Sequence, residues 1–248
     1  MSLEGAKVLI VGGSAGIGRA LGVGAVRAGA DVVFAARRRD RLDDAVAEAG
    51  GGHAVAFDVC DEAGIPVAVD EAVGVLGGLD VVVQAAGVAR LARFTDVDAA
   101  QWREAMDTNV VGPALVTRAA LPHLPPSAVV VFCSSTTDEQ PRWGLAAYGA
   151  SKAALNRVVD AFRAERPDLR FVRAVIGSTI GTEFGDAFDG PLLEEAFARW
   201  IVGAQSTAKM MTTGDLAPVV LDVLSTLRAH PDRRWPGHLD RVNARSLE

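Results

Sequence analysis

Short apolar runs alternate with longer stretches of mixed apolar and polar residues along the first two thirds of the chain. The apolar runs are rich in valine and lie at 7–11, 31–35, 53–57, 79–84, 128–133 and 169–176. The stretches between them carry apolar residues at helical spacing and lie at 16–28, 40–49, 61–75, 98–121 and 146–164. Strands that alternate with helices predict βαβ units and a parallel sheet. Because the strands are almost wholly apolar, we expect helices on both faces of that sheet.

The same pattern predicts an α/β fold with one doubly wound domain over residues 1–248. No linker rich in proline, glycine or serine interrupts it, although 248 residues would also allow two small domains. The stretch 183–212 breaks the alternation, and we interpret it as an insertion or substrate lid. A last helix is predicted within 214–229, and the tail from His230 is polar and interrupted by proline. The active crevice is expected at the carboxyl ends of the strands.

The composition argues against several classes of function. A net charge of −6 and an isoelectric point near 5.3 disfavour nucleic acid as a partner, because binding a polyanion requires a basic surface. Two lone cysteines, and histidines without metal-ligand spacing, predict neither a disulfide framework nor a metal site. The first apolar run is too short for a signal peptide, and no run reaches the roughly 18 residues of a membrane span. We therefore expect a cytoplasmic protein without a membrane partner.

A glycine-rich loop follows the first strand. In "KVLIVGGSAGIGRAL", Gly12, Gly16 and Gly18 lie between that strand and the next helix. Glycines at such a turn let the backbone approach a pyrophosphate, whose charge is neutralised by amides at the helix N-terminus. A tight turn without a ligand is the alternative interpretation, and the strand–loop–helix setting favours the phosphate site.

Tyr148 is the only tyrosine in the chain, and Lys152 follows it by four residues in "YGASK". On a helix these two side chains lie on the same face. A free phenol has a pKa of about 10, which is too high for efficient proton exchange at neutral pH, and a nearby ammonium lowers it. We therefore predict that Tyr148 is a general acid and base whose pKa is lowered by Lys152.

Together, the G-x-x-x-G-x-G spacing and "YGASK" resemble the short-chain dehydrogenase/reductase family, from about residue 5 to about residue 182. The resemblance implies a single Rossmann-type domain that binds NAD or NADP and interconverts carbonyl and secondary alcohol groups. "TNVVG" at 108–112 resembles the segment that carries the family's active-site asparagine, and "VFCSS" at 131–135 resembles the segment that carries its serine. The implied catalytic residues are Asn109, Ser135, Tyr148 and Lys152.

In the mechanism that the resemblance implies, Tyr148 exchanges a proton with the substrate oxygen, and Ser135 hydrogen-bonds the same oxygen. Lys152 holds the nicotinamide ribose, and Asn109 anchors a proton-relay water. The substrate is a small carbonyl compound or alcohol whose identity stays open, with residues 136–147 and 183–212 expected to shape its pocket. By the same analogy we expect a homodimer or homotetramer.

The resemblance also implies a set of cofactor-binding residues. They are Gly12, Ser14, Gly16, Ile17, Gly18, Arg37, Arg38, Asp58, Val59, Ala86, Gly87, Tyr148, Lys152, Ile180 and Thr182. Asp58 is expected at the adenine ring. NAD-binding members usually have an acidic residue at the end of the second strand, where this chain has Ala36 followed by Arg37 and Arg38. Guanidinium groups suit a 2′-phosphate, so we favour NADP (NADPH) over NAD; the alternative is a solvated helix start balanced by nearby aspartates.

Four positions depart from the family pattern. Val11 replaces a threonine, Gln84 and Ala85 replace an asparagine pair, Arg173 replaces an asparagine, and Gly177-Ser178 replaces Pro-Gly. Because of the Gln84-Ala85 and Gly177-Ser178 changes, the alternative to an oxidoreductase is a dinucleotide-binding regulatory or scaffold protein without turnover. Within enzymes, the same catalytic set also suits an epimerisation or an imine reduction.

Overall fold

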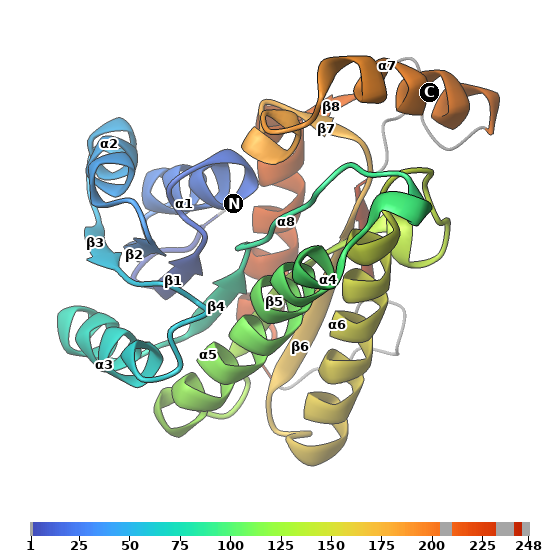
Figure 1. Cartoon of the computed structure of the whole chain (residues 1–248). Coiled ribbons are helices and arrows are strands. Elements are labelled where there is room, and N and C mark those ends of the chain that lie inside the picture. The colour runs from blue at the N-terminus through green and yellow to red at the C-terminus, as the bar shows by residue number, and fades with distance from the viewer. Residues whose placement is uncertain (1, 204–209, 232–240, 245–248) are drawn as a thin grey trace.

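The computed structural model describes residues 2–203, 210–231 and 241–244. Its centre is a seven-stranded sheet in the order β3-β2-β1-β4-β5-β6-β9, with every neighbouring pair parallel (Figure 1). The strands are β1 (Lys7–Val11), β2 (Asp31–Ala36), β3 (His53–Ala56), β4 (Val81–Gln84), β5 (Val129–Ser135), β6 (Arg170–Ile176) and β9 (Arg241–Ala244). The strand order reverses between β1 and β4, and ligands of such folds bind at this switch point. The predicted α/β fold with a doubly wound parallel sheet is confirmed.

Helices cover both faces of the sheet. One face carries α1 (Gly16–Arg27), α2 (Arg39–Ala49) and α8 (Thr213–Ala229), and the other carries α3 (Gly64–Leu76), α5 (Gly112–Ala120) and α6 (Ala146–Glu165). Successive residues of β1 divide between the two cores, because Val8 and Ile10 pack on the first side and Leu9 and Val11 on the second. A strand buried on both faces produces this period of two. Within the described residues, no helix is long and apolar enough to cross a membrane.

The stretch 98–121, predicted as one long helix, is divided in the structure. It forms α4 (Ala99–Met106), a π-helical turn η2 (Asp107–Val111) and then α5. Asp98 begins α4 with a capping box that it shares with Gln101. The π-helical turn contains Asn109, and such turns inside helices often occur at functional sites.

The stretch 183–212 contributes α7 (Gly190–Val202) and a short 3₁₀ turn, η5 (Glu183–Gly185), near the carboxyl end of the sheet. The strand β7 (Thr179–Ile180) precedes this stretch and pairs in parallel with β8 (Met211–Thr212) at its end. The two ends of the stretch therefore lie next to each other. Residues 204–209 of the predicted insertion lie outside the described residues. That this segment forms a substrate lid remains a prediction. The assignment of residues 1–248 to a single domain also remains a prediction.

The sequence pattern assigned no secondary structure to the polar tail. Residues 241–244 form β9, which pairs with β6 and covers its outer edge. A short polar strand such as "RVNA" gives little signal in a sequence, because an edge strand gains its stability from pairing with the neighbour.

Candidate active site

The glycine-rich loop lies against the loop that follows β4. Gly12 has a φ of +87°, and a Cβ added there would collide with the backbone nitrogen of Ala86. A Cβ on Gly18 would likewise collide with the carbonyl oxygen of Gly12. Helix α1 begins after Ala15, and no side chain caps its first amides. These amides therefore remain available to an anion at the switch point.

Three of the predicted catalytic side chains meet at the end of β5. Ser135 is the last residue of that strand, and Tyr148 and Lys152 lie on successive turns at the start of α6. The hydroxyl of Ser135 hydrogen-bonds Tyr148 and accepts a bond from Thr137 Oγ1 at 3.0 Å. Lys152 Nζ donates to the carbonyl of Cys133 at 2.9 Å and lies 5.7 Å from the centroid of the Tyr148 ring.

Asn109 is fully buried next to this group. Its Nδ2 donates to the Val88 carbonyl and to Ser151 Oγ, both at 2.9 Å, and its Oδ1 accepts from the Val88 amide at 2.8 Å. A Cβ on Gly87 would lie 3.2 Å from Asn109 Oδ1 and 3.6 Å from Lys152 Nζ. Gly87 therefore allows the asparagine and the lysine to approach the same backbone segment.

The electrostatics around Tyr148 differ from the expectation. Burial raises the pKa of Tyr148 to about 12, and the opposing influences are the hydrogen bond from Ser135 and the positive charge of Arg142. Burial also lowers the pKa of Lys152 to about 8. The prediction that Lys152 lowers the tyrosine pKa is therefore wrong for this structure, because the lysine is itself buried and its ammonium is directed at the carbonyl of Cys133.

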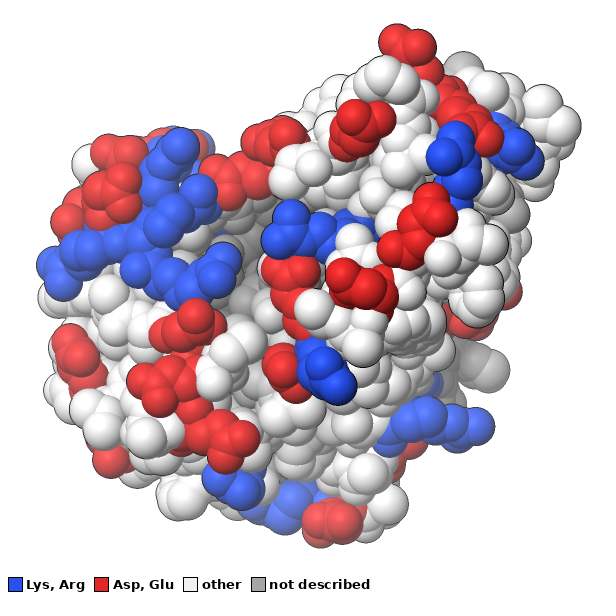
Figure 2. Space-filling model, viewed as in Figure 1, with Lys and Arg blue, Asp and Glu red and all other residues white. Residues whose placement is uncertain are grey.

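The arginines at the start of α2 lie in two different environments. Arg37 is 69% exposed and only 3.9 Å from the Asp58 carboxylate, whereas Arg38 forms a 2.5 Å ion pair with Glu183. The bond to Glu183 raises the pKa of Arg38. Asp58 also accepts a bond from the Cys60 amide at 2.9 Å. Figure 2 shows basic side chains gathered on this part of the molecule, at the edge of a central hollow.

The remaining predicted cofactor residues lie in or next to the same crevice wall. Thr182 touches the glycine loop, because a Cβ on Gly16 would lie 3.3 Å from its Cβ. Ser14 is buried, and Ile180 is 46% exposed on β7. Ile17 packs against the core beneath α1, and Val59 is buried beside Gly112.

Aromatic side chains and one arginine gather around Tyr148 near α7. The guanidinium carbon of Arg142 lies 5.7 Å from the ring centroid of Trp200 on α7, whose Nε1 donates to the Trp143 carbonyl at 2.9 Å. Phe184 makes an edge contact with Tyr148, with ring centroids 5.0 Å apart. Arg142 lies within 136–147, which was expected to shape the pocket, but nothing in the sequence showed that its side chain faces the tyrosine.

The departures from the family pattern are accommodated by local bonds. Gln84 Nε2 donates to Thr117 Oγ1 at 3.2 Å, and its Oε1 is buried without a partner among the described residues. Arg173 forms a 3.4 Å ion pair with Asp160 on α6. The Gly177 carbonyl accepts a bond from Thr179 at 3.2 Å. None of these bonds involves a predicted catalytic side chain.

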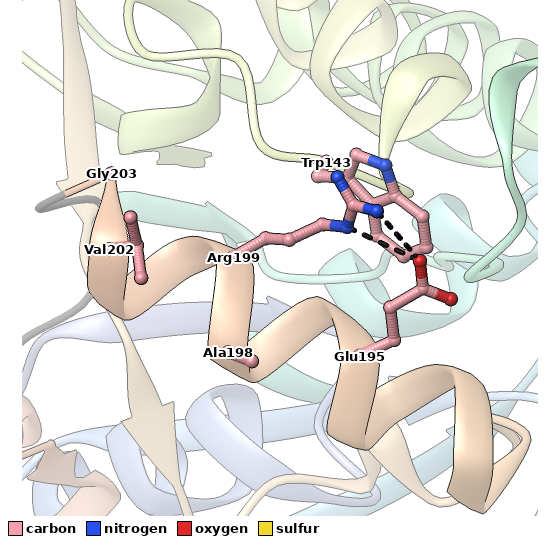
Figure 3. A pocket seen from close by; sticks show the side chains of 6 residues that line it. All are labelled: Trp143, Glu195, Ala198, Arg199, Val202 and Gly203. Atoms are coloured by element: carbon pink, nitrogen blue, oxygen red, sulfur yellow. Dashed lines mark hydrogen bonds and ion pairs between the residues drawn. The ribbon is translucent and has the colours of Figure 1, made fainter.

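A separate open hollow of about 570 Å³ lies beside α7 and Trp143 (Figure 3). Its lining residues are Trp143, Glu195, Ala198, Arg199, Val202 and Gly203. Arg199 lies over the Trp143 ring at 4.8 Å and pairs with Glu195 at 2.9 Å. None of the four predicted catalytic residues lines this hollow, so we do not assign the chemistry to it.

Comparison with known proteins identifies the family. A family model described as short chain dehydrogenase matches residues 6–184. A short chain dehydrogenase from Pseudocercospora fijiensis is 36% identical over 66% of this chain and 55% of its own length. Gluconate 5-dehydrogenase from Gluconobacter oxydans is 34% identical over 63% of this chain and 64% of its own length. The chain belongs to the short chain dehydrogenase family, and these matches span between half and two thirds of the relatives.

Solved structures agree with this assignment. A short chain dehydrogenase from Burkholderia cenocepacia in complex with NADP superposes with a TM-score of 0.79, is 25% identical, and covers 90% of this chain and 92% of its own. A short-chain dehydrogenase from Streptomyces avermitilis has a TM-score of 0.77 at 28% identity, covering 96% of this chain and 87% of its own.

Proposed function

We propose that this chain is an NADP-dependent oxidoreductase that transfers a hydride between nicotinamide and a carbonyl or secondary alcohol substrate. The observation that carries the proposal is the group formed by Ser135, Tyr148 and Lys152 beside the glycine loop, with Lys152 and Asn109 both approaching Gly87. Membership of the short chain dehydrogenase family and the NADP bound by the Burkholderia structure support it.

The residues at the switch point fit a dinucleotide. Gly12 and Gly18 leave a cradle that a Cβ would fill, and the uncapped amides of α1 suit a pyrophosphate. Arg37 offers an exposed guanidinium to a 2′-phosphate. When bound, the nicotinamide supplies or accepts the hydride, which no side chain of the protein can do.

The chain's own residues handle the proton. With a pKa of about 12, Tyr148 is protonated at neutral pH and is ready to donate to a carbonyl oxygen, as reduction requires. Thr137 donates to Ser135 Oγ, which leaves the Ser135 hydroxyl hydrogen free to point toward the tyrosine or the substrate oxygen. Two preorganised donors thus stabilise the negative charge that develops on that oxygen.

The choice of NADP is tested by fluorescence titration with NADPH and NADH. We expect Arg37→Gln to weaken NADPH binding about tenfold or more and to leave NADH binding unchanged, because a charge-assisted bond to phosphate is lost. Arg39→Gln is the matched control, since Arg39 pairs with Asp43 on the surface of α2 at 2.9 Å. Equal losses in both variants would contradict a specific phosphate contact, and tighter binding of NADH by the unmodified protein would overturn the preference.

A further inference from the structure

A second cationic side chain, the guanidinium of Arg142, acts on Tyr148. Arg142 lies six residues before Tyr148, in the segment that leads into α6. Its Nη2 is 3.5 Å from the hydroxyl of Thr136, the residue after Ser135, and its charge acts on the Tyr148 phenol. Lys152 approaches Gly87 and the cofactor crevice, whereas Arg142 faces Trp200 on α7. The two cations near the tyrosine therefore contact different parts of the molecule.

Among the residues that the structure describes, no carboxylate forms an ion pair with Arg142. Of its five N–H donors, only one makes a hydrogen bond within the described residues, and that bond is at the long limit of 3.5 Å to a neutral hydroxyl. Other arginines of the region have carboxylates: Arg199 and Arg93 pair with Glu195 at 2.9 and 2.6 Å. Burial lowers the pKa of Arg142, because partial removal from water disfavours its charged form. An anion that binds beside Arg142 would offset this cost.

The surroundings define what kind of anion fits. Leu145, Trp200 and Phe188 belong to an apolar cluster that also contacts Tyr148, so the space beside the reacting hydroxyls has an apolar wall. Lys152 Nζ is directed at the Cys133 carbonyl at 2.9 Å, so its ammonium already has a hydrogen-bond acceptor. One guanidinium balances a single negative charge, and its planar fork matches a carboxylate in a bidentate manner.

We propose that Arg142 binds a carboxylate of the substrate, so that the preferred substrates are keto acids or the corresponding hydroxy acids. The proposal rests on the proposed oxidoreductase function, because it places the reacting carbonyl at Ser135 and Tyr148 and the carboxylate at Arg142. It makes Arg142 a residue that determines specificity, distinct from the catalytic residues. If Arg142 only packs on Trp200, or only acts on Tyr148, its substitution should affect keto acids and their esters equally.

The test uses straight-chain keto acids in which the carbonyl moves stepwise away from the carboxylate, each paired with its methyl ester. With NADPH, we expect kcat/KM to favour the best acid over its ester by about tenfold to 100-fold, the range given by a charge-assisted bidentate bond. Arg142→Gln should remove that preference, mainly through KM, and should change kcat/KM for the ester less than about threefold. Arg199→Gln is the control, because it removes a charge near the same tryptophans without facing Tyr148, and the acid preference should remain.

Calorimetric titration of the same acids, with and without NADPH, separates this proposal from the proposed function. Acids that bind the unmodified protein and fail to bind Arg142→Gln support the anion site even if no compound is reduced. NADPH binding without any turnover would then count against the oxidoreductase function alone. Equal losses for acid and ester in Arg142→Gln, or acids that bind both proteins equally, would overturn the role of Arg142.

Discussion

Replacing Lys152 by methionine is expected to stabilise the folded protein while it abolishes turnover. Methionine has a similar length but no ammonium, and the site is buried. The pKa of Lys152 falls from 10.5 to about 8 on folding, which corresponds to about 3 kcal/mol of destabilisation when the group is charged. The Cys133 carbonyl loses its bond in the variant, which costs about 1 kcal/mol. The net expectation near neutral pH is a gain of about 2 kcal/mol.

The pH dependence of this gain follows from proton linkage. The pKa is lower in the folded state, so between about pH 8 and pH 10.5 the unfolded chain binds more protons than the folded one. The stability of the unmodified protein therefore rises with pH across this window as Lys152 loses its charge. The variant has no ammonium to titrate, so its advantage should shrink from about 2 kcal/mol near pH 7 to nearly zero near pH 10.

Urea unfolding at the two pH values measures the free energies directly. Lys7→Met is the matched control, because Lys7 Nζ makes the same kind of bond, 2.7 Å to the Gly77 carbonyl, in an exposed position. For Lys7→Met we expect a small change in the free energy of unfolding that is the same near pH 7 and near pH 10. A Lys152→Met variant that is less stable near pH 7, with the same difference near pH 10, would refute the reasoning that burial of the charge opposes folding.

Three further predictions concern the crevice. Gly12→Ala should lower the free energy of unfolding by more than about 1 kcal/mol and abolish NADPH binding, because Gly12 has a φ of +87° and a Cβ there meets Ala86. Unfolding and NADPH titration curves like those of the unmodified protein would contradict the role of Gly12 in the cofactor site. Glu183→Gln should release Arg38 from its ion pair and tighten NADPH binding several-fold without changing NADH binding, and unchanged NADPH affinity would show that Arg38 does not reach the phosphate. Ser135→Ala should lower kcat by about 100-fold or more while NADPH binding is retained, as measured by steady-state kinetics beside a titration; a loss below about threefold would exclude Ser135 as a donor to the substrate oxygen.

The sequence predicted the parts of the fold that depend on periodicity. The valine-rich runs and the stretches between them mark six strands and their covering helices, because burial on both faces leaves an unbroken apolar signal. It did not predict β9, which gains its stability from pairing with β6 and has no apolar pattern of its own. Nor did it predict the π-helical turn at Asn109, since that depends on how the helix meets the loop after β4.

The candidate site divides in the same way. Tyr148, Lys152 and the glycines follow from spacing along one helix or one turn, so a sequence motif is enough to find them. The pKa values do not follow, because they depend on burial and on the carbonyl that Lys152 contacts. The proposed role of Arg142 depends on the three-dimensional structure, because α7 brings Trp200 against its guanidinium and no carboxylate among the described residues pairs with it.

The central claim is that Tyr148 is the acid and base of an NADP-dependent hydride transfer. The most direct measurement is the loss of NADPH absorbance with a panel of carbonyl compounds, for the unmodified protein and for Tyr148→Phe, with NADPH binding titrated in the same samples. The account predicts turnover by the unmodified protein, and in Tyr148→Phe a loss of nearly all turnover with NADPH affinity retained. NADPH binding with no turnover by the unmodified protein, or turnover that Tyr148→Phe leaves intact, would contradict it and would favour a dinucleotide-binding protein that does not use this phenol.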